Sequence, residues 1–218
     1  MAEKIQRYKS DAIAVRYDAK RCIHAAECVR GLPTVFNPRE RRWVKLENAR
    51  ADEVAAIVVR CPTGALHYER NDNGASEPTP NENVIRAQAH GPHYVRGDIR
   101  VPAATGETLL SETRAALCRC GASQNKPFCD NSHAHAAFQD AATWRHEVET
   151  PNDSAATQSL HLTPTENGSL KVEGEVAIYN AEGALIFHGK KAFLCRCGAS
   201  QNKPFCDGSH ARVGFRAD

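Results

Sequence analysis

The sequence predicts an α+β protein in which a small N-terminal unit precedes a duplicated, β-rich region. Two observations lead to this prediction: a long internal repeat in a chain of 218 residues, and a change of composition near residue 70. Residues 1–70 hold 14 Lys and Arg against 9 Asp and Glu, a net of +5; subtraction from the chain totals of 28 and 26 leaves 14 against 17, a net of −3. A chain of this length commonly contains one to three domains.

The N-terminal unit, residues 1–70, has the pattern of a small α+β domain. Alternating apolar residues predict a strand at 13–17, and a cysteine-containing loop follows it. A strand at 43–46, a helix at 51–60 and a strand at 65–68 complete the order. The polar segment NDNGASEPTPNEN at 71–83 has few residues that can be buried, so we interpret it as a linker.

The rest of the chain contains two copies of one module. The fourteen residues LCRCGASQNKPFCD at 117–130 recur unchanged at 194–207, an offset of 194 − 117 = 77. The first copy is assigned to residues 84–149 and the second to 159–218, with a polar linker at 150–158 between them. Alternation at 169–178 predicts a hairpin with turn residues at 180–183, and the first copy shows a weaker pattern at 94–101.

Composition and cysteine content exclude several classes of protein. The 41% hydrophobic and 25% charged residues are typical of a globular domain, and the longest apolar stretches, such as 54–59, are far shorter than the roughly 20 residues of a membrane span. Residues 1–10 contain no apolar leader segment, which predicts a reducing, cytoplasmic location. Nine clustered cysteines cannot all pair with one another, so metal or redox chemistry is expected.

Each copy carries a C-x-C-x8-C-x3-H pattern. Its members are Cys118, Cys120, Cys129 and His133 in the first copy, and Cys195, Cys197, Cys206 and His210 in the second. Residues i and i+2 of an extended segment face the same side, so the first two cysteines can bind one iron. If Asp130 caps a short helix, Cys129 and His133 lie on one face and can bind a second iron.

The longer motif C-x-C-x2-S-x3-P-x-C-D-[G/N]-S-H resembles the signature of the CDGSH, or NEET, iron–sulfur family and covers roughly residues 84–218. The resemblance implies a [2Fe–2S] cluster held by three Cys and one His in each copy. It also implies a β-cap fold of two paired halves, here an intramolecular pseudo-dimer in a monomeric chain. Asn131 replaces glycine in the first copy, and Asn tolerates left-handed backbone angles. The ligand set alone also permits a structural zinc site.

A third group of cysteines lies in the N-terminal unit. Cys22, Cys28 and the Cys61-Pro62 pair resemble the cysteine run of a bacterial ferredoxin in which Ala25 replaces the middle cysteine. Residues 16–68 look like a divergent single-cluster ferredoxin of the type found beside CDGSH domains. Three thiolates imply a [3Fe–4S] cluster. His24 as a fourth ligand would complete a [4Fe–4S] cluster, although a surface histidine is the commoner interpretation.

These sites favour electron transfer over catalysis, because the sequence shows three cluster motifs and no phosphate loop or nucleophile–base pair. The expected partner is a reductase or an oxidase, and the +5 charge of residues 1–70 favours an acidic partner surface. Two His in place of two Cys raise a [2Fe–2S] potential from about −400 mV to roughly −150 to +300 mV, so one His predicts an intermediate value.

Two other functions stay open at this stage. Protonation of a single His ligand competes with the metal as the pH falls toward roughly 6.5, which is consistent with a sensor or a donor that passes labile [2Fe–2S] clusters to apo iron–sulfur proteins. A structural zinc-binding protein is the other alternative. Neither a membrane nor a nucleic acid is expected as a partner, because the basic loop Arg39, Arg41 and Arg42 is most simply a solvated turn.

Overall fold

The computed structural model describes residues 5–102, 108–146, 148 and 159–217. The chain divides into two compact units, Met1–Pro78 and Thr79–Asp218. The boundary falls inside the segment 71–83, whereas the linker predicted at 150–158 lies outside the described residues. Within the described residues, no helix has the length and apolar character needed to cross a bilayer.

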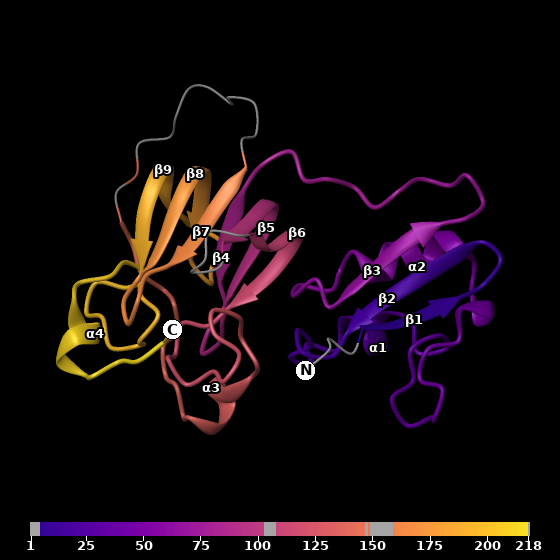
Figure 1. Cartoon of the computed structure of the whole chain (residues 1–218), viewed down its shortest axis with the longest axis horizontal. Helices are drawn as coiled ribbons and strands as arrows, with labels where there is room; N and C mark the ends of the chain where they lie inside the picture. Colours follow the sequence, from indigo (N-terminus) through magenta and orange to yellow (C-terminus); the bar gives the residue numbers. More distant parts are fainter. Residues whose placement is uncertain (1–4, 103–107, 147, 149–158, 218) are drawn as a thin grey trace. The chain divides into compact units, whose positions relative to one another are not determined.

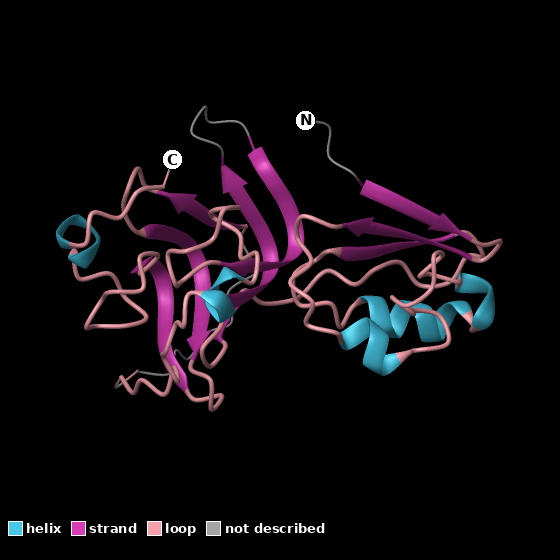
Figure 2. Cartoon of the chain, turned by 90° about the horizontal axis from the view of Figure 1, so that it is seen from below, coloured by secondary structure: helices cyan, strands magenta, loops and turns pink. Residues whose placement is uncertain are grey.

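The N-terminal unit is a three-stranded antiparallel sheet with short helices. The strands are β1 (Ile5–Lys9), β2 (Ile13–Asp18) and β3 (Leu66–Arg70), in the order β1-β2-β3. The helices are α1 (Glu27–Gly31), the single 3₁₀ turn η1 (Leu46–Asn48) and α2 (Ala51–Val58). Figure 2 shows these helices gathered on one side of the sheet. The strands predicted at 13–17 and 65–68 and the helix predicted at 51–60 are therefore confirmed, the helix ending at Val58.

The strand predicted at 43–46 is wrong. Val44 forms only an isolated bridge with Phe36, and Leu46 begins η1. Both Val44 and Leu46 are buried in the core of the unit, so their alternation reflects burial of a loop rather than pairing in a sheet. The sequence analysis also missed β1 and α1, which have no strong apolar periodicity.

The regular secondary structure of the C-terminal unit is almost entirely β-strand (Figure 1). They are β4 (Val84–Ala87), β5 (His93–Pro102), β6 (Thr108–Leu117), β7 (Leu160–Pro164), β8 (Leu170–Tyr179) and β9 (Leu185–Leu194). Its described helices are α3 (Ser132–His135) and α4 (Ser209–Arg212), each of 4 residues. The predicted hairpin is confirmed as β8 and β9. Since the helices are so few and short, the chain is mostly β, and the α+β class describes only the N-terminal unit.

Strands of the two repeats are interleaved in one six-stranded sheet. Each repeat contributes an antiparallel hairpin, β5–β6 or β8–β9. The strand before each hairpin also pairs with the other repeat: β4 runs parallel to β8, and β7 runs parallel to β5. Ile85 lies opposite Ile178, and Ile99 opposite Leu160; all four side chains are buried in one shared core. Neither repeat therefore has a complete core of its own.

Candidate metal centres

The first two cysteines of each repeat lie side by side directly after a hairpin strand. Cys118 and Cys120 follow β6, and their sulfur atoms are 3.6 Å apart. The sulfur atoms of Cys195 and Cys197, which follow β9, are 3.7 Å apart. Two thiolates on one tetrahedral metal, with metal–sulfur bonds of about 2.3 Å, have their sulfur atoms about 3.8 Å apart. Each pair is therefore spaced to share one metal.

The third cysteine and the histidine form a second pair. The Cys129 sulfur lies 3.5 Å from Nδ1 of His133, and the Cys206 sulfur lies 3.3 Å from Nδ1 of His210. A thiolate and an imidazole on one tetrahedral metal are separated by about 3.5 Å, given bonds of about 2.3 and 2.0 Å. Among the residues that the structure describes, no three His, Cys, Asp or Glu side chains are grouped as ligands of a single ion. The donors of each repeat thus form two pairs.

Asp130 does not cap the short helix as predicted. The N-cap of α3 is Asn131, which has a left-handed φ of 73°, and its side chain makes no capping hydrogen bond. Asp130 instead accepts hydrogen bonds from the backbone N–H groups of Ser132 and Gln124, at 3.0 and 2.8 Å. Its carboxylate therefore braces the loop before the helix, and this brace holds Cys129 and His133 in place. Asp207 makes the equivalent bonds in the second repeat.

Burial keeps several of these thiols neutral when no cation is nearby. Burial raises the pKa of Cys129 to about 11 and the pKa of Cys197 to about 11. A hydrogen bond with Cys120 lowers the pKa of Cys118 to about 6 and raises the pKa of Cys120 itself. Burial, together with the charge of Arg119, lowers the pKa of His133, which favours the neutral imidazole that a metal requires. The donor sets thus fit iron–sulfur clusters, whose positive irons stabilise thiolates.

The two cysteine loops contact each other. A Cβ atom built on Gly121 would lie 2.9 Å from the carbonyl oxygen of Cys197, and one built on Gly198 would lie 2.9 Å from the carbonyl oxygen of Cys120. Both glycines also have left-handed φ angles, +82° and +78°. A side chain at either position would push the loops apart. Figure 1 shows both loops, with α3 and α4, at the same end of the sheet.

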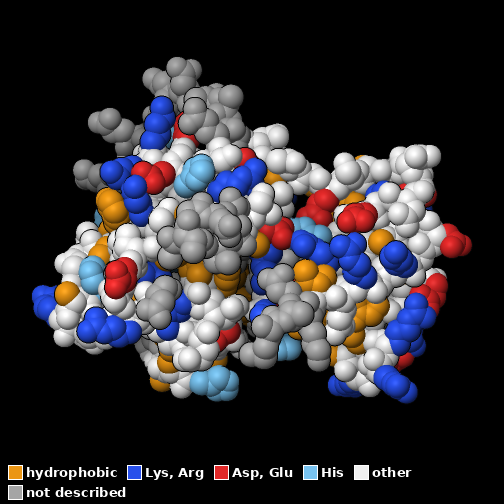
Figure 3. Space-filling view, in the orientation of Figure 1, with side chains coloured by type: hydrophobic (Ala, Val, Ile, Leu, Met, Phe, Trp, Pro, Cys, Tyr) orange, Lys and Arg blue, Asp and Glu red, His pale blue; other side chains and the backbone are white. Residues whose placement is uncertain are grey.

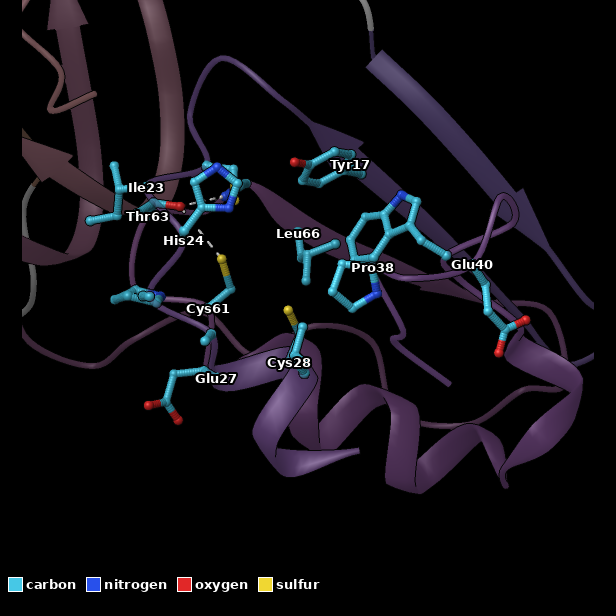
Figure 4. Close-up of a pocket in the computed structure, with 17 residues that line it drawn as sticks. Tyr17, Ile23, His24, Glu27, Cys28, Pro38, Glu40, Cys61, Thr63 and Leu66 are labelled. Atoms are coloured by element: carbon cyan, nitrogen blue, oxygen red, sulfur yellow. Dashed lines mark hydrogen bonds between the residues drawn. The ribbon is translucent and has the colours of Figure 1, made fainter. Parts of the chain in front are cut away.

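The three N-terminal cysteines line one cavity. Cys22 follows β2, Cys28 lies in α1 and Cys61 follows α2, and all three line a cavity of about 440 Å³ (Figure 4). His24 and Ala25 line the same cavity, and its volume is within the range of ligand pockets, roughly 300–1,000 Å³. Burial, and then the neighbouring Cys61, raise the pKa of Cys28 to about 11. A bound metal is thus needed here too if the Cys28 thiol is to ionise near neutral pH.

Two buried arginines were missed by the sequence analysis. Arg119 and Arg196 lie between the first two cysteines of their repeats, and each is less than 5% exposed. Nη2 of Arg119 donates to the Gln88 carbonyl at 2.6 Å, and Nε of Arg196 donates to the Gly168 carbonyl at 2.9 Å. The signal available in the sequence was their position between two predicted ligands.

Comparisons with known proteins agree with these sites. Residues 8–71 match the family described as a divergent 4Fe-4S mono-cluster, and residues 90–134 and 167–211 match the family described as an iron-binding zinc finger of CDGSH type. The uncharacterized protein YjdI, in Escherichia coli K12 and in Escherichia coli O157:H7, is 31% identical over 61 residues, which are 28% of this chain and 80% of the relative. No solved structure matches the chain. The chain thus belongs to the CDGSH iron-binding family, with a divergent 4Fe-4S mono-cluster domain before its two CDGSH modules.

Proposed function

We propose that this chain transfers electrons through three iron–sulfur clusters. Two are [2Fe–2S] clusters held by three Cys and one His in each CDGSH module, and the third is held by Cys22, Cys28 and Cys61. The pairing of the CDGSH donors supports two irons per module, because each pair is spaced to bind its own metal. A single zinc ion would instead draw all four donors around one point.

The contact between the two cysteine loops is the observation that carries this proposal. Gly121 lies against Cys197 and Gly198 lies against Cys120, so the ligand sets of the two modules are neighbours. Electron exchange between metal centres becomes steeply faster as their separation decreases. Clusters held by neighbouring loops are suited to pass electrons to each other, whereas a purely structural metal site gains nothing from such proximity.

We further infer that the CDGSH modules form an intramolecular pseudo-dimer with a β-cap. The reciprocal parallel pairings, β4 with β8 and β7 with β5, support this arrangement. Residues 77 apart also occupy equivalent places, as Gly121 and Gly198 do. One chain supplies both halves, so the protein acts as a monomer in this proposal.

The proposed partner is a cytoplasmic reductase or oxidase, and the chain is a carrier rather than a catalyst. In the view of Figure 3, Lys and Arg side chains of the N-terminal unit are interspersed with Asp and Glu. On this face the unit offers a partner a mixed surface rather than one block of positive charge. The surface of the N-terminal unit includes exposed ion pairs, such as Arg42 with Glu47 at 2.9 Å. Salt weakens such pairs.

Transfer of clusters to apo-proteins is a second candidate function. It is favoured by the position of His133 and His210, which are partly exposed and lie in helices of only 4 residues. Such short helices have few hydrogen bonds of their own, so local opening at these ligands costs little free energy. The opening would release the metal that the Cys–His pair of each module would hold.

A redox titration of anaerobically prepared protein, followed by electron paramagnetic resonance (EPR), tests the proposal. We expect reversible reduction of all three centres, and retention of iron when the protein is mixed with an apo-ferredoxin. Cys129→Ser and Cys206→Ser serve as matched variants, each removing one CDGSH signal and about two irons per chain. Irreversible bleaching on reduction would exclude the carrier. Quantitative transfer of iron to the apo-ferredoxin would establish the second candidate instead, and a colourless protein with stoichiometric zinc would exclude both.

A further inference from the structure

The N-terminal cavity contains more potential ligands than its three cysteines. A [4Fe–4S] cluster usually has four protein ligands, one for each iron. The N-terminal unit supplies only Cys22, Cys28 and Cys61 as thiols. The remaining cavity-lining side chains with a donor atom are listed here: Tyr17, His24, Glu27, Glu40, Trp43 and Thr63. A fourth ligand needs a metal-binding atom that no other side chain already holds.

The two carboxylates are already held by basic side chains. Glu27 Oε2 accepts a hydrogen bond from Arg60 at 2.7 Å, and Glu27 Oε1 lies 3.6 Å from Arg30. Glu40 forms an ion pair with Lys45. A carboxylate would have to break these pairs to reach a metal. Glutamate is also an uncommon partner for iron–sulfur clusters, which favour thiolate and imidazole.

The hydroxyl groups and the indole are also unsuited to the task. Tyr17 already forms a hydrogen bond with the Cys22 thiol, so its hydroxyl oxygen is engaged by one of the three cysteines. The Thr63 hydroxyl oxygen accepts from the Ala65 N–H at 3.1 Å and lies 3.5 Å from the Cys61 sulfur. An indole N–H is a donor only and cannot bind a metal.

His24 is the cavity-lining donor that remains. No hydrogen bond or ion pair of its imidazole is found in the described residues, and the side chain is exposed at the rim. His24 lies two residues after Cys22, at a left-handed φ of 57°. Figure 4 shows its ring and the sulfur atoms of Cys28 and Cys61 around the same hollow. Ala25, at the position of the usual ferredoxin cysteine, has no ligand atom.

We propose that His24 is the fourth ligand of the N-terminal cluster and thereby selects a four-iron over a three-iron cluster. This inference rests on the proposed binding of a cluster by Cys22, Cys28 and Cys61. A neutral imidazole is a frequent metal ligand, and His24 would be the most exposed of the four ligands, because the three cysteines are only partly exposed. The histidine would then replace, from the neighbouring position, the thiol that Ala25 lacks.

The test compares the wild-type full chain with His24→Ala after identical anaerobic reconstitution. An oxidised three-iron cluster gives an EPR signal, whereas oxidised two-iron and four-iron clusters are EPR-silent. The CDGSH modules therefore do not obscure the result. We expect the oxidised wild type to be silent, and His24→Ala to gain this signal while losing about one iron per chain. His161→Ala, at an exposed histidine of β7, is the matched control and should stay silent.

Two further variants protect the test against misfolding. His24→Cys should remain silent and keep its iron, because a thiolate replaces the imidazole. Ala25→Cys introduced into His24→Ala should restore the silent four-iron state from the neighbouring position. A three-iron signal in the wild type, or an unchanged iron count and silent spectrum in His24→Ala, would refute ligation by His24. Neither result would affect the carrier proposal, whereas absence of iron at all three cysteines would refute the N-terminal cluster itself.

Discussion

The two CDGSH modules share fourteen identical residues around their cysteines, yet the charges behind those residues differ. Arg119 of the first module forms an ion pair with Asp140 at 2.8 Å, with both side chains less than 10% exposed. The equivalent residue of the second module, Arg196, donates to the carbonyls of Gly168 and Thr165, and Ala217 occupies the place of the aspartate. A repeated motif thus specifies the paired donor side chains but not the electrostatic surroundings of each proposed cluster.

The difference in charge also affects the cysteines of the other module, because the two cysteine loops are in contact. The charge of Arg119 acts on Cys120 and on Cys195 of the second module, and the charge of Arg196 acts on Cys118 of the first. Asp140 also lies 3.8 Å from Lys203 of the second module. A single carboxylate therefore compensates a positive charge from each module, and no residue 77 positions later repeats it.

Asp140→Ala gives the first module the charge pattern of the second and should have the largest effect. It leaves Arg119 buried without its carboxylate, which we expect to cost about 3 kcal/mol of unfolding free energy. Loss of a negative charge near the clusters should also raise their reduction potentials. Urea unfolding followed by circular dichroism, and an EPR redox titration, measure the two effects.

The converse change, Ala217→Asp, offers Arg196 a carboxylate and should lower the potentials. Opposite shifts in the two variants would show that the charge, rather than the loss of packing, is responsible. Equal potentials in Asp140→Ala and the wild type would contradict this account, because the removed charge would then have no influence on either cluster.

The pairing of the donor side chains in each module could be predicted from the sequence, because their spacing is local. The i and i+2 cysteines, and the cysteine and histidine four apart, require only an extended segment and one helical turn. The Arg119–Asp140 pair could not be predicted, since the residues are 21 positions apart and Asp140 lies in a segment without regular secondary structure. The same applies to the fold: the β8–β9 hairpin follows from alternation, whereas the parallel pairing of β4 with β8 joins distant segments.

His93→Leu tests a second difference, because Leu170 occupies the equivalent position of the second module. His93 is fully buried, and burial, together with the charge of Arg119, lowers its pKa to about 3. Arg119 in turn faces Asp140 and the Trp144 ring. The folded protein keeps His93 neutral, whereas the unfolded chain takes up a proton below about pH 6.5. The contribution of neutral His93 to the free energy of unfolding is therefore fully present above about pH 6.5. It is lost as the pH falls toward 3, by up to about 1.4 kcal/mol per pH unit.

The variant should remove this part of the pH dependence. Unfolding free energies measured in urea at several pH values between 4 and 7, on the same preparation, provide the comparison; the wild-type slope should exceed that of His93→Leu. Identical slopes would mean that His93 has the same protonation state in the folded and the unfolded chain. Leu170→Ala is unsuitable as a control because it opens a cavity, so Glu166→Gln, which alters an exposed carboxyl of the second module, is used instead.

Asn131→Gly should have the smallest effect, because it only makes the first motif identical to the second. Asn131 has a φ of 73° and its counterpart Gly208 a φ of 83°, so the backbone already adopts the left-handed conformation expected of it. The left-handed conformation causes little steric strain in Asn. We therefore expect a change of less than about 1 kcal/mol in unfolding free energy and no loss of iron. Gly208→Val is the informative contrast, since a β-branched side chain is strained at this φ and should cost more. If Asn131→Gly instead increased the iron content of the first module, the asparagine would already be weakening that site, and the difference between the modules would begin at the motif itself rather than at the charges behind it.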